Sequence, residues 1–401
     1  MDIEKFVPAV RFCVASDTHI REDRDYGPER INKVISFARE LACKDKNYSS
    51  LDAAAFAGDL TDAGREIQFD MFYKAVSDSL GKDTRLLATV AKSHDCNTLG
   101  KAALGYYKKI TGLPTDFHYT INGFHFIGIS TCDEEGIYYN ESQREFLKKS
   151  LDEASADSPE KPIFVFHHEH VKRTVYGSSD FDGWGNDYFS DILFDYPQII
   201  DFSGHSHYPL NDPRSIWQGE ITALGTGACF YAEFTVDGER KVRPDGCYEI
   251  AQFYLVEADV YNSVRIRGYD ALNEVLLCEY LIENPASKNA RKYVPRMIEA
   301  KAEAPHFSEG AEPVIKTCED KIKITVPQAV SADGGIIFAY RLTAYGKNGE
   351  ETEVQRIINR YWLGRNAAEI VFEINAENAA EVTITAENAF GMKSDELRVI
   401  I

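Results

Sequence analysis

The sequence predicts an α/β fold for most of the chain, followed by a small all-β sandwich. Short apolar runs of strand length alternate with helical patterns over roughly the first half of the chain. After a segment rich in Ala, Glu, Lys and Pro, only strand patterns recur. With 401 residues and 44% hydrophobic residues, the chain can bury two cores. We therefore expect domains at 1–285 and 313–401, joined by a linker at 286–312.

The N-terminal part should form a sheet with crossover helices, because each apolar run is followed by residues at helical spacing. Every cluster of polar residues follows directly after a predicted strand, which is where open α/β sheets place their ligand crevices. Helices are expected at 28–41, 69–80, 142–154 and 188–194. Strands are expected at 10–15, 53–57, 86–91, 124–129, 163–166 and 199–202.

From residue 221 to residue 282 the pattern changes to successive strands, such as 251–256 and 263–268, which we expect to form a second sheet that completes the first domain. The linker is expected to be partly helical at 293–302. Turn signals such as Asn348-Gly349 then separate short strands, as in a small antiparallel sandwich. These strands are expected near 314–317, 321–326, 336–345, 353–359, 369–374 and 381–386.

Charge and composition narrow the classes of function. A formal charge of −20 makes nucleic acid an unlikely partner, because such binding depends on Lys and Arg neutralising phosphates. The start of the chain lacks the pattern of a signal peptide, and no stretch is apolar for the length of a membrane span. We expect a cytoplasmic protein, although a removed leader would leave the same sequence. The eight cysteines form no C-x-x-C pair, so free thiols are expected.

Five clusters at strand ends carry the residues suited to metal chemistry. They hold seven of the ten histidines, and imidazole and carboxylate groups are ligands for Fe, Mn or Zn. Taken singly, the two Asp clusters and the His-Asp pair are more often ordinary polar turns, and each histidine-rich cluster is as compatible with a structural role as with metal binding. In chain order they are Asp17-Thr18-His19, Gly58-Asp59-Leu60-Thr61-Asp62, His94-Asp95, His167-His168-Glu169-His170 and Gly204-His205-Ser206-His207.

Taken in order, these clusters resemble the signature of the calcineurin-like metallophosphoesterases: D-x-H, G-D-x-x-[DE], G-N-H-[DE], H and G-H-x-H. The match spans roughly 10–210. The resemblance implies a four-layer α/β/β/α sandwich that carries two divalent or trivalent ions, Fe, Mn or Zn, at the strand ends. The C-terminal part is similar in pattern to a fibronectin type III or immunoglobulin-like module, with a packing or docking role.

The resemblance also assigns roles to single residues. Asp17, His19 and His207 would hold one metal, and Asp59 would bridge to the second. His168 and His205 would complete the second site. His167 is an alternative to His168, because the family's H-x-P segment lacks its proline here. Asp62 would orient ligands.

The loop Ala91-Lys92-Ser93-His94-Asp95 departs from the family's G-N-H-D. Ser93 takes the position of the amide ligand, and a hydroxyl is a shorter and poorer ligand than an Asn carbonyl. His94, steered by Asp95, would be the catalytic group facing the substrate.

The resemblance implies hydrolysis of a small phosphomonoester or phosphodiester by a hydroxide that bridges two metals. The alternative is a degenerate family member that binds ligand or a single metal without efficient turnover, because Ser93 weakens the second site. The loops 174–177, 183–186 and 208–212 either line the substrate mouth or serve ordinary packing. The sequence leaves the natural substrate, the metal and the oligomeric state open.

Overall fold

The computed structural model describes residues 6–131, 138–365, 369–376 and 379–401. The chain divides into two compact units, Met1–Pro295 and Arg296–Ile401. Their boundary lies inside the segment 286–312 expected to be the linker. Across the described ranges, no helix combines the length and the apolar character needed to cross a membrane.

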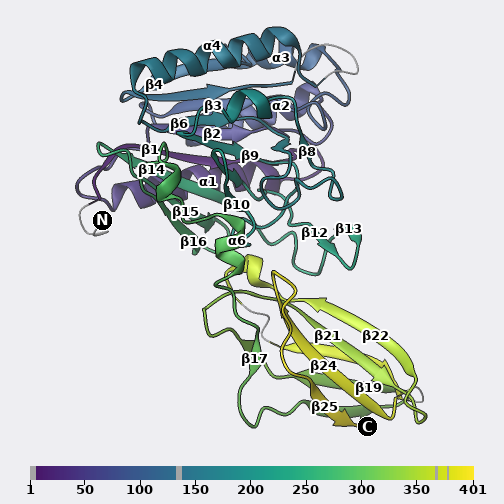
Figure 1. Ribbon diagram of the computed structural model, residues 1–401. Coiled ribbons are helices and arrows are strands. Elements are labelled where there is room, and N and C mark those ends of the chain that lie inside the picture. The colour runs from purple at the N-terminus through teal and green to yellow at the C-terminus, as the bar shows by residue number, and fades with distance from the viewer. Residues whose placement is uncertain (1–5, 132–137, 366–368, 377–378) are drawn as a thin grey trace. The chain divides into compact units, whose positions relative to one another are not determined.

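The first unit contains a mixed sheet of six strands in the order β16-β15-β14-β1-β2-β3 (Figure 1). β1, β2 and β3 are parallel neighbours, and β14 pairs antiparallel with β1, placing Phe12 opposite Val256. The expectation that the strands after residue 221 form a separate sheet is therefore wrong for β14, β15 and β16, because β14 completes the free edge of β1. The strands are β1 (Pro8–Ala15), β2 (Ala53–Ala57), β3 (Arg85–Thr89), β14 (Gln252–Asp259), β15 (Val264–Asp270) and β16 (Val275–Ile282).

A second six-stranded sheet has the order β10-β11-β9-β6-β5-β4. Its strands are β4 (Phe117–Ile121), β5 (Phe124–Gly128), β6 (Ile163–Phe166), β9 (Ile199–Ser203), β10 (Ile216–Gln218) and β11 (Thr222–Gly225). The Phe12 ring of the first sheet lies 4.7 to 6.1 Å from the rings of Phe126, Phe164, Phe166 and Phe202 in the second. The two sheets thus pack face to face through buried phenylalanines.

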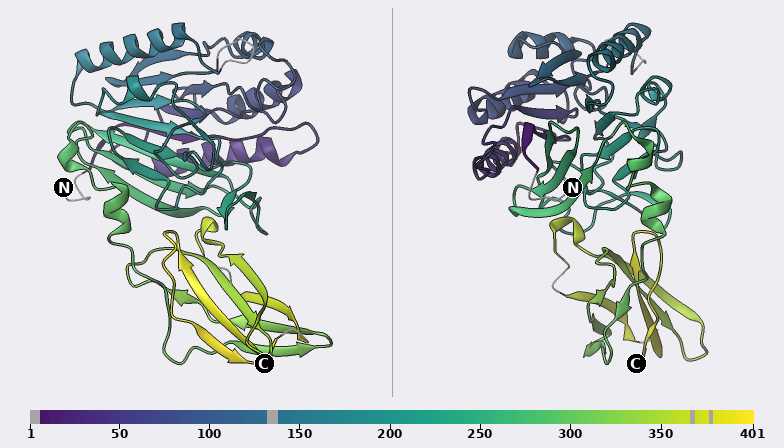
Figure 2. Two further views of the ribbon diagram at one scale, coloured as in Figure 1. Left: turned by 45° about the vertical axis from the view of Figure 1, so that its right-hand side comes forward. Right: turned by 60° about the vertical axis from the view of Figure 1, so that its left-hand side comes forward.

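Helices cover the outer faces of the two sheets, as Figures 1 and 2 show. α1 (Tyr26–Cys43), α2 (Glu66–Ser79) and α3 (Ala102–Thr111) share one buried cluster with the first sheet. α4 (Glu141–Asp157) and α5 (Ser190–Leu193) pack in the same way against the second. α3 and β4 were not predicted from the sequence, because both are short and their apolar positions are interrupted by glycine or polar residues.

Short elements complete the first unit. β7 (His170–Val171) pairs with β8 (Gly185–Asn186), and β12 (Phe234–Val236) pairs with β13 (Glu239–Val242). Near the unit boundary a 3-10 turn (Lys288–Ala290) precedes α6 (Pro295–Glu299), which is shorter than the helix expected at 293–302.

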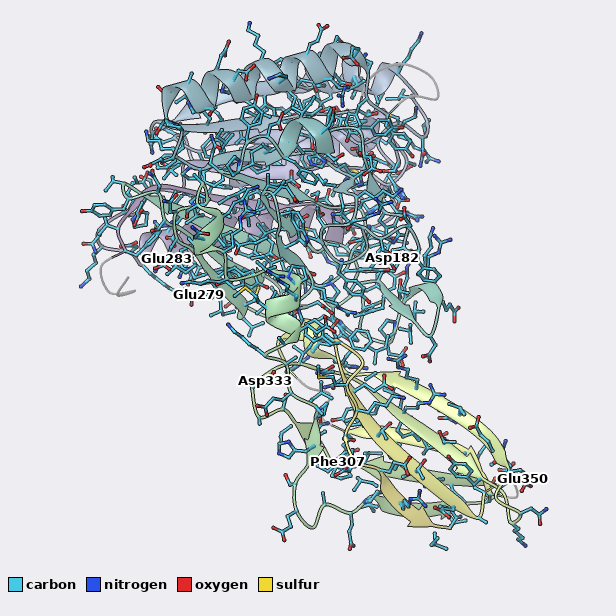
Figure 3. All side chains as sticks on the ribbon, viewed as in Figure 1. Asp182, Glu279, Glu283, Phe307, Asp333 and Glu350 are labelled. Atoms are coloured by element: carbon cyan, nitrogen blue, oxygen red, sulfur yellow. The ribbon has the colours of Figure 1, made fainter. Side chains whose placement is uncertain are left out.

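The second unit is built from antiparallel strands around one apolar cluster. One sheet contains β18 (Val314–Cys318), β19 (Lys321–Val326) and β23 (Ile370–Asn375). The other contains β21 (Ile337–Tyr345), β22 (Glu351–Ile358), β24 (Glu381–Asn388) and β25 (Leu397–Ile400), while β17 (His306–Phe307) pairs with β20 (Ala329–Val330). The ring of Phe307, labelled in Figure 3, lies 6.4 Å from that of Tyr340.

The cysteines agree with the expectation of free thiols as far as they are described. Cys13, Cys43, Cys96, Cys229, Cys247 and Cys278 are free. Cys132 and the side chain of Cys318 lie outside the described residues.

A buried charge cluster ties the first sheet together. The carboxylate of Glu257 on β14 has no exposed surface and accepts hydrogen bonds from Arg11 (2.7 Å), Arg265 (2.7 Å) and Arg267 (3.1 Å). Burial by itself would raise the pKa of Glu257, but the three guanidiniums hold it below its usual range. The carboxylate therefore stays ionised and pairs with arginines from the two strands that flank β14.

We predict that Glu257→Gln lowers the free energy of unfolding by about 3–5 kcal/mol, because Arg11 loses its buried counter-charge. The lowered pKa of Glu257 means that its contribution is fully present above the usual range of glutamate. It is lost as the pH falls through the lowered value. Urea unfolding at neutral and acidic pH measures both effects.

The matched control is Glu40→Gln, which breaks an exposed helical pair with Lys44. This change should cost less than about 1 kcal/mol. Equal effects of the two substitutions would contradict the central role of Glu257.

Candidate metal centre

The strands β1, β2, β6 and β9 bring the predicted ligands to one place, because their carboxyl ends meet at the same edge of the two facing sheets. Backbone hydrogen bonds join the loops that follow these strands. The Asp17 amide donates to Gly58 (3.1 Å), and the His19 amide donates to Asp59 (3.1 Å). The Gly204 amide donates to His168 (2.9 Å). Backbone hydrogen bonds thus fix the positions of the loops that carry the candidate ligands.

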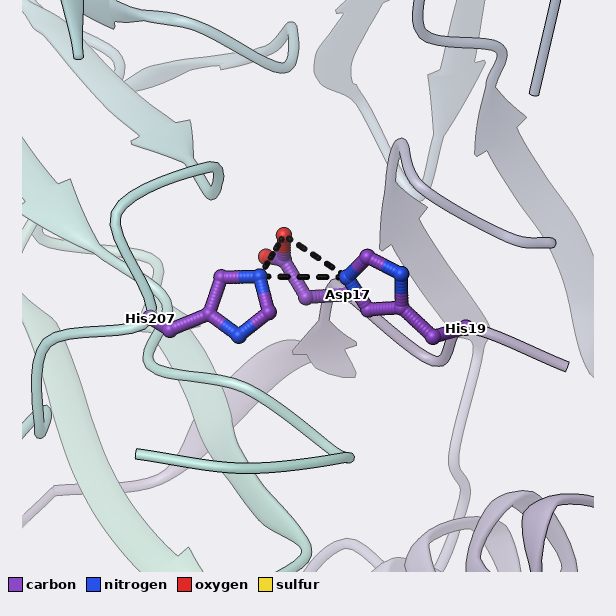
Figure 4. A group of neighbouring side chains, drawn as sticks. All are labelled: Asp17, His19 and His207. Carbon is purple, nitrogen blue, oxygen red and sulfur yellow. Dashed lines mark hydrogen bonds and ion pairs between the residues drawn. The ribbon is translucent and has the colours of Figure 1, made fainter. Parts of the chain in front are cut away.

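Asp17, His19 and His207 form one triad (Figure 4). The Nε2 atoms of His19 and His207 are 3.1 Å apart, and His207 Nε2 is 3.1 Å from Asp17 Oδ1. All three side chains are buried. The first triad therefore joins the end of β1 in the first sheet to the end of β9 in the second.

Asp59, His168 and His205 form a second triad. His168 Nε2 lies 3.1 Å from Asp59 Oδ2 and 3.1 Å from His205 Nδ1. The same Asp59 oxygen is 3.9 Å from His19 Nε2 of the first triad. A single carboxylate oxygen therefore lies between the two groups of imidazoles.

Hydrogen bonds to backbone carbonyls orient the imidazoles. The Nδ1–H of His168 donates to the Ala57 carbonyl (2.9 Å), and that of His207 donates to the Tyr231 carbonyl (3.1 Å). A carbonyl can only accept, so Nδ1 carries the proton and Nε2 faces the triad. This is the arrangement in which a histidine presents Nε2 as a metal ligand.

The backbone around the triads is strained in a consistent way. Five of the candidate ligands have a left-handed backbone, with φ between 41° and 74°: Asp17, His19, Asp59, His205 and His207. Non-glycine residues rarely adopt this region, and each instance costs about 1–3 kcal/mol where the surroundings enforce it. The concentration of strain at one place points to a functional requirement there rather than to a requirement of the fold.

Two glycines make room for the ligands. A Cβ on Gly58 would lie 2.6 Å from His168 Nδ1, and one on Gly204 would lie 2.4 Å from Asp17 Oδ2. Gly58 also has φ of 81°. Glycine at these positions lets the backbone pass directly behind a ligand side chain.

The electrostatics of the triads balance negative against positive groups. Burial alone would raise the pKa of Asp17 and Asp59, but the neighbouring imidazoles hold both below the usual range. Burial opposes protonation of His207 and His168, yet the carboxylates raise the pKa of both imidazoles. Burial and the charge of His168 lower the pKa of His205 to about 4. Each carboxylate thus has an imidazole partner that stabilises its charge, and a cation bound at the same place would provide that stabilisation instead.

The donor set fits metal ions. Two ligand atoms that each lie about 2.0–2.2 Å from one ion are separated by about 3–3.5 Å, which matches the 3.1 Å contacts within the triads, while His19 Nε2 lies 3.9 Å from Asp17 Oδ1. The mixture of imidazole and carboxylate suits Fe, Mn or Zn.

The loop after β3 lies beside Asp59. Ser93 Oγ donates to Asp59 Oδ1 (2.6 Å), and the His94 amide approaches the same oxygen (3.2 Å). The His94 ring is half-exposed and lies 4.4 Å from the ring of His19, while its Nδ1–H donates to the Asp62 carbonyl (2.7 Å). Ser93 therefore anchors the carboxylate that joins the triads, and His94 stands at their open side.

The expectation that Asp95 steers His94 is wrong, because the Asp95 side chain points the other way. Its carboxylate is fully buried and accepts from the Thr61 amide (2.8 Å), the Thr61 hydroxyl (2.8 Å) and the Ala91 amide (2.9 Å). Burial and the charge of Asp59 raise the pKa of Asp95 to about 6. Asp95 thus ties the loop after β2 to the loop after β3, while the Asp62 carbonyl orients His94.

Asp62 contacts a ligand of this centre, whereas His167 contacts a residue outside it. Asp62 Oδ1 lies 3.5 Å from His19 Nδ1, next to the ligand that it was expected to orient. His167, the alternative to His168, is turned away and pairs with the buried Asp201 at 2.8 Å. His168, and not His167, thus lies in the second triad.

Aromatic residues that the sequence analysis missed also touch the triads. The Tyr231 ring lies 4.1 Å from His207, and Phe230 lies 5.7 Å from His19. These residues follow β11, so the strand-end rule applied to one further strand would have found them. Of the three loops weighed as the substrate mouth, 183–186 reaches the centre, with the Trp184 ring 4.9 Å from that of His205.

Comparisons with known proteins give only distant similarities. No protein-family model and no curated protein matches the sequence. A purple acid phosphatase from yellow lupin (Lupinus luteus) seeds is similar in structure over 73% of this chain, with 12% identity and a TM-score of 0.48. The match spans 56% of the lupin protein. GAP50, the anchor in the inner membrane complex of Plasmodium, is similar over 71% of this chain and 93% of its own length, with 12% identity and a TM-score of 0.46. TM-scores below 0.5 establish no activity for this chain.

We predict that Gly204→Ala lowers the metal content of the purified protein while the core stays folded, because the new Cβ would displace the Asp17 carboxylate. Metal analysis after equilibration with Zn or Mn, together with circular dichroism, measures the two effects. Gly105→Ala in α3 is the matched control, since a Cβ there meets open space. It should retain the metal and be stabilised by about 0.5–1 kcal/mol. Unchanged metal content in Gly204→Ala would remove Asp17 from the ligand set.

Proposed function

We propose that the unit Met1–Pro295 is a metal-dependent phosphoesterase that hydrolyses a small phosphomonoester or phosphodiester. The observation that carries the proposal is the position of Asp59 Oδ2, 3.1 Å from His168 Nε2 in one triad and 3.9 Å from His19 Nε2 in the other. A carboxylate shared between two imidazole-rich groups is the arrangement needed to hold two cations close together.

In this proposal Asp17, His19 and His207 would hold one ion, His168 and His205 would hold the other, and Asp59 would be shared between them. A pair of ions at such a site makes a bound water acidic near neutral pH and neutralises phosphoryl oxygens, which is the chemistry of phosphoester hydrolysis. Fe, Mn and Zn all suit these ligands.

His94 is the group proposed to face the substrate. Its Nδ1–H is held by the Asp62 carbonyl, so Nε2 is the free ring nitrogen, and it can give a proton to the leaving oxygen when both ring nitrogens are protonated. Asp95 acts as a positioning residue, because it fixes the loop that carries His94 through Thr61 and Ala91.

A second candidate function is binding of a ligand or one metal without efficient turnover. It is favoured by the Ser93 hydroxyl, which bonds to Asp59 Oδ1 and offers no carbonyl to a second ion. Metal analysis together with assays on p-nitrophenyl phosphate and bis-p-nitrophenyl phosphate separates the candidates. Two ions with turnover support hydrolysis, whereas an intact fold with neither supports the second candidate.

The unit Arg296–Ile401 enters the proposal as an accessory module. Its two antiparallel sheets around one core support the expected fibronectin-like or immunoglobulin-like sandwich, which we assign to packing or docking.

We predict that Asp59→Asn lowers turnover by at least about 100-fold and reduces the bound metal, because the neutral amide cannot compensate two cations. The metal-free protein should remain folded, since the two apolar clusters lie elsewhere. Asp191→Asn, which breaks an exposed pair with Arg144, is the control and should leave both readouts unchanged. Normal turnover with full metal content in Asp59→Asn would refute the assignment.

The Ser93 position yields a separate prediction. Ser93→Asn should lower the concentration of added metal needed for half-maximal activity, because an Asn carbonyl supplies a ligand at the same backbone position. The double change with Lys92→Gly tests whether the backbone of the loop also has to relax. If neither variant differs from the parent in metal content or in rate at limiting metal, residue 93 does not supply a ligand.

A further inference from the structure

An aromatic wall borders the first triad. We define it as Phe230, Tyr231 and Tyr248, which come from the segment between β11 and β14. Tyr231 lies 4.1 Å from the His207 ring, and Phe230 lies 5.7 Å from the His19 ring. The Tyr248 ring is 5.5 Å from each of the other two wall rings. One aromatic ring therefore lies between Tyr248 and each of two candidate metal ligands: Tyr231 before His207 and Phe230 before His19.

The wall runs from the buried centre to the surface. Phe230 and Tyr231 are 5% and 8% exposed, whereas Tyr248 is 43% exposed. Two buried rings thus connect the ligands to one ring that solvent reaches. A large exposed aromatic ring beside a candidate catalytic centre is a surface on which a flat ligand can stack.

Buried hydrogen bonds hold the wall in place. The buried Arg30 guanidinium donates to the carbonyls of Phe230 (2.6 Å) and Tyr248 (2.5 Å). The Arg243 guanidinium lies 3.9 Å from the centre of the Tyr231 ring and donates to its hydroxyl (2.7 Å). The rings are therefore positioned before a ligand binds, which reduces the entropy lost on binding.

The guanidinium of Arg24 also lies against the wall, and one of its nitrogen atoms has no hydrogen-bond partner among the described residues. The Arg24 guanidinium lies 4.7 Å above the centre of the Phe230 ring. Its Nη1 is buried and has no hydrogen-bond partner among the residues that the structure describes. The positive charge of this guanidinium makes the neighbourhood of the Phe230 ring favourable for an anionic ligand.

From these contacts we infer that the site takes phosphate esters whose alcohol part carries a flat aromatic ring, and that Tyr248 stacks on this ring. A nucleoside monophosphate has the required parts, because its phosphate and its base are separated by a sugar. This inference rests on the proposed function for the place of the phosphate, and on the ring contacts for the place of the base. The selectivity comes from Tyr248, while the ions that the triads would hold bind the phosphate common to all esters.

The test compares two ligands that differ only in the ring. Adenosine 5′-monophosphate and ribose 5-phosphate share the same phosphate and the same leaving oxygen. We expect the metal-loaded protein to bind the nucleotide about tenfold more tightly, since stacking of one base on an aromatic side chain is worth roughly that factor or more. Isothermal titration calorimetry measures the two affinities, and phosphate release measures the two rates.

Three variants locate the effect. Tyr248→Ala should abolish the preference and leave the affinity for ribose 5-phosphate unchanged, whereas Tyr248→Phe should retain it because the ring remains. Tyr261→Ala removes another exposed tyrosine, between β14 and β15 at the opposite end of the sheet, and should change nothing.

The outcomes separate the two proposals. If Tyr248→Ala removes the preference for the nucleotide and neither ligand releases phosphate, stacking on Tyr248 is supported and hydrolysis is contradicted. Turnover of both ligands at equal affinity supports hydrolysis and contradicts stacking on Tyr248. A preference that survives in Tyr248→Ala also contradicts stacking on Tyr248. Failure to bind either ligand also contradicts the inference that the wall binds the ring of a phosphate ester.

Discussion

Burial of two carboxylates at one place is the constraint on which the rest of the centre depends. Asp17 and Asp59 are both almost completely buried, and like charges in such surroundings are tolerated only when each is paired. His207 and His168 provide these partners at 3.1 Å. The left-handed backbone at the ligands and the absence of a side chain at Gly58 and Gly204 follow from the need to bring these groups together.

The face-to-face packing of the two sheets makes this pairing possible. Both carboxylates follow strands of the first sheet, whereas their imidazole partners follow strands of the second. Neither triad exists within one sheet, so the phenylalanines between the sheets set the distance from carboxylate to imidazole. The buried contacts of Phe12 with Phe164 and Phe202 therefore support the site as well as the core.

The sequence predicted what depends on local pattern and missed what depends on distant pairing. The strand at 163–166 matches β6 residue for residue, and the histidine clusters lie at strand ends as expected. No local pattern indicated that β14 would pair with β1, because that contact joins segments more than 200 residues apart. The direction of a side chain in a loop is equally hidden. His94 and Asp95 are adjacent, yet one faces the centre and the other faces Thr61.

The chain is acidic overall, yet three cations lie beside the centre, and this difference bears on the choice of ligand. A net charge of −20 repels long polyanions over the whole surface. Cations nevertheless lie over the aromatic rings beside both triads: Arg24 over Phe230, Arg243 over Tyr231 and Lys241 over Trp184. Their attraction is screened within about 8–10 Å at physiological salt, so it acts on an anion that has already entered the mouth. A small phosphorylated molecule can reach these cations while most of a polyanion would remain against the acidic surface, and the electrostatics therefore favour the compact ligand.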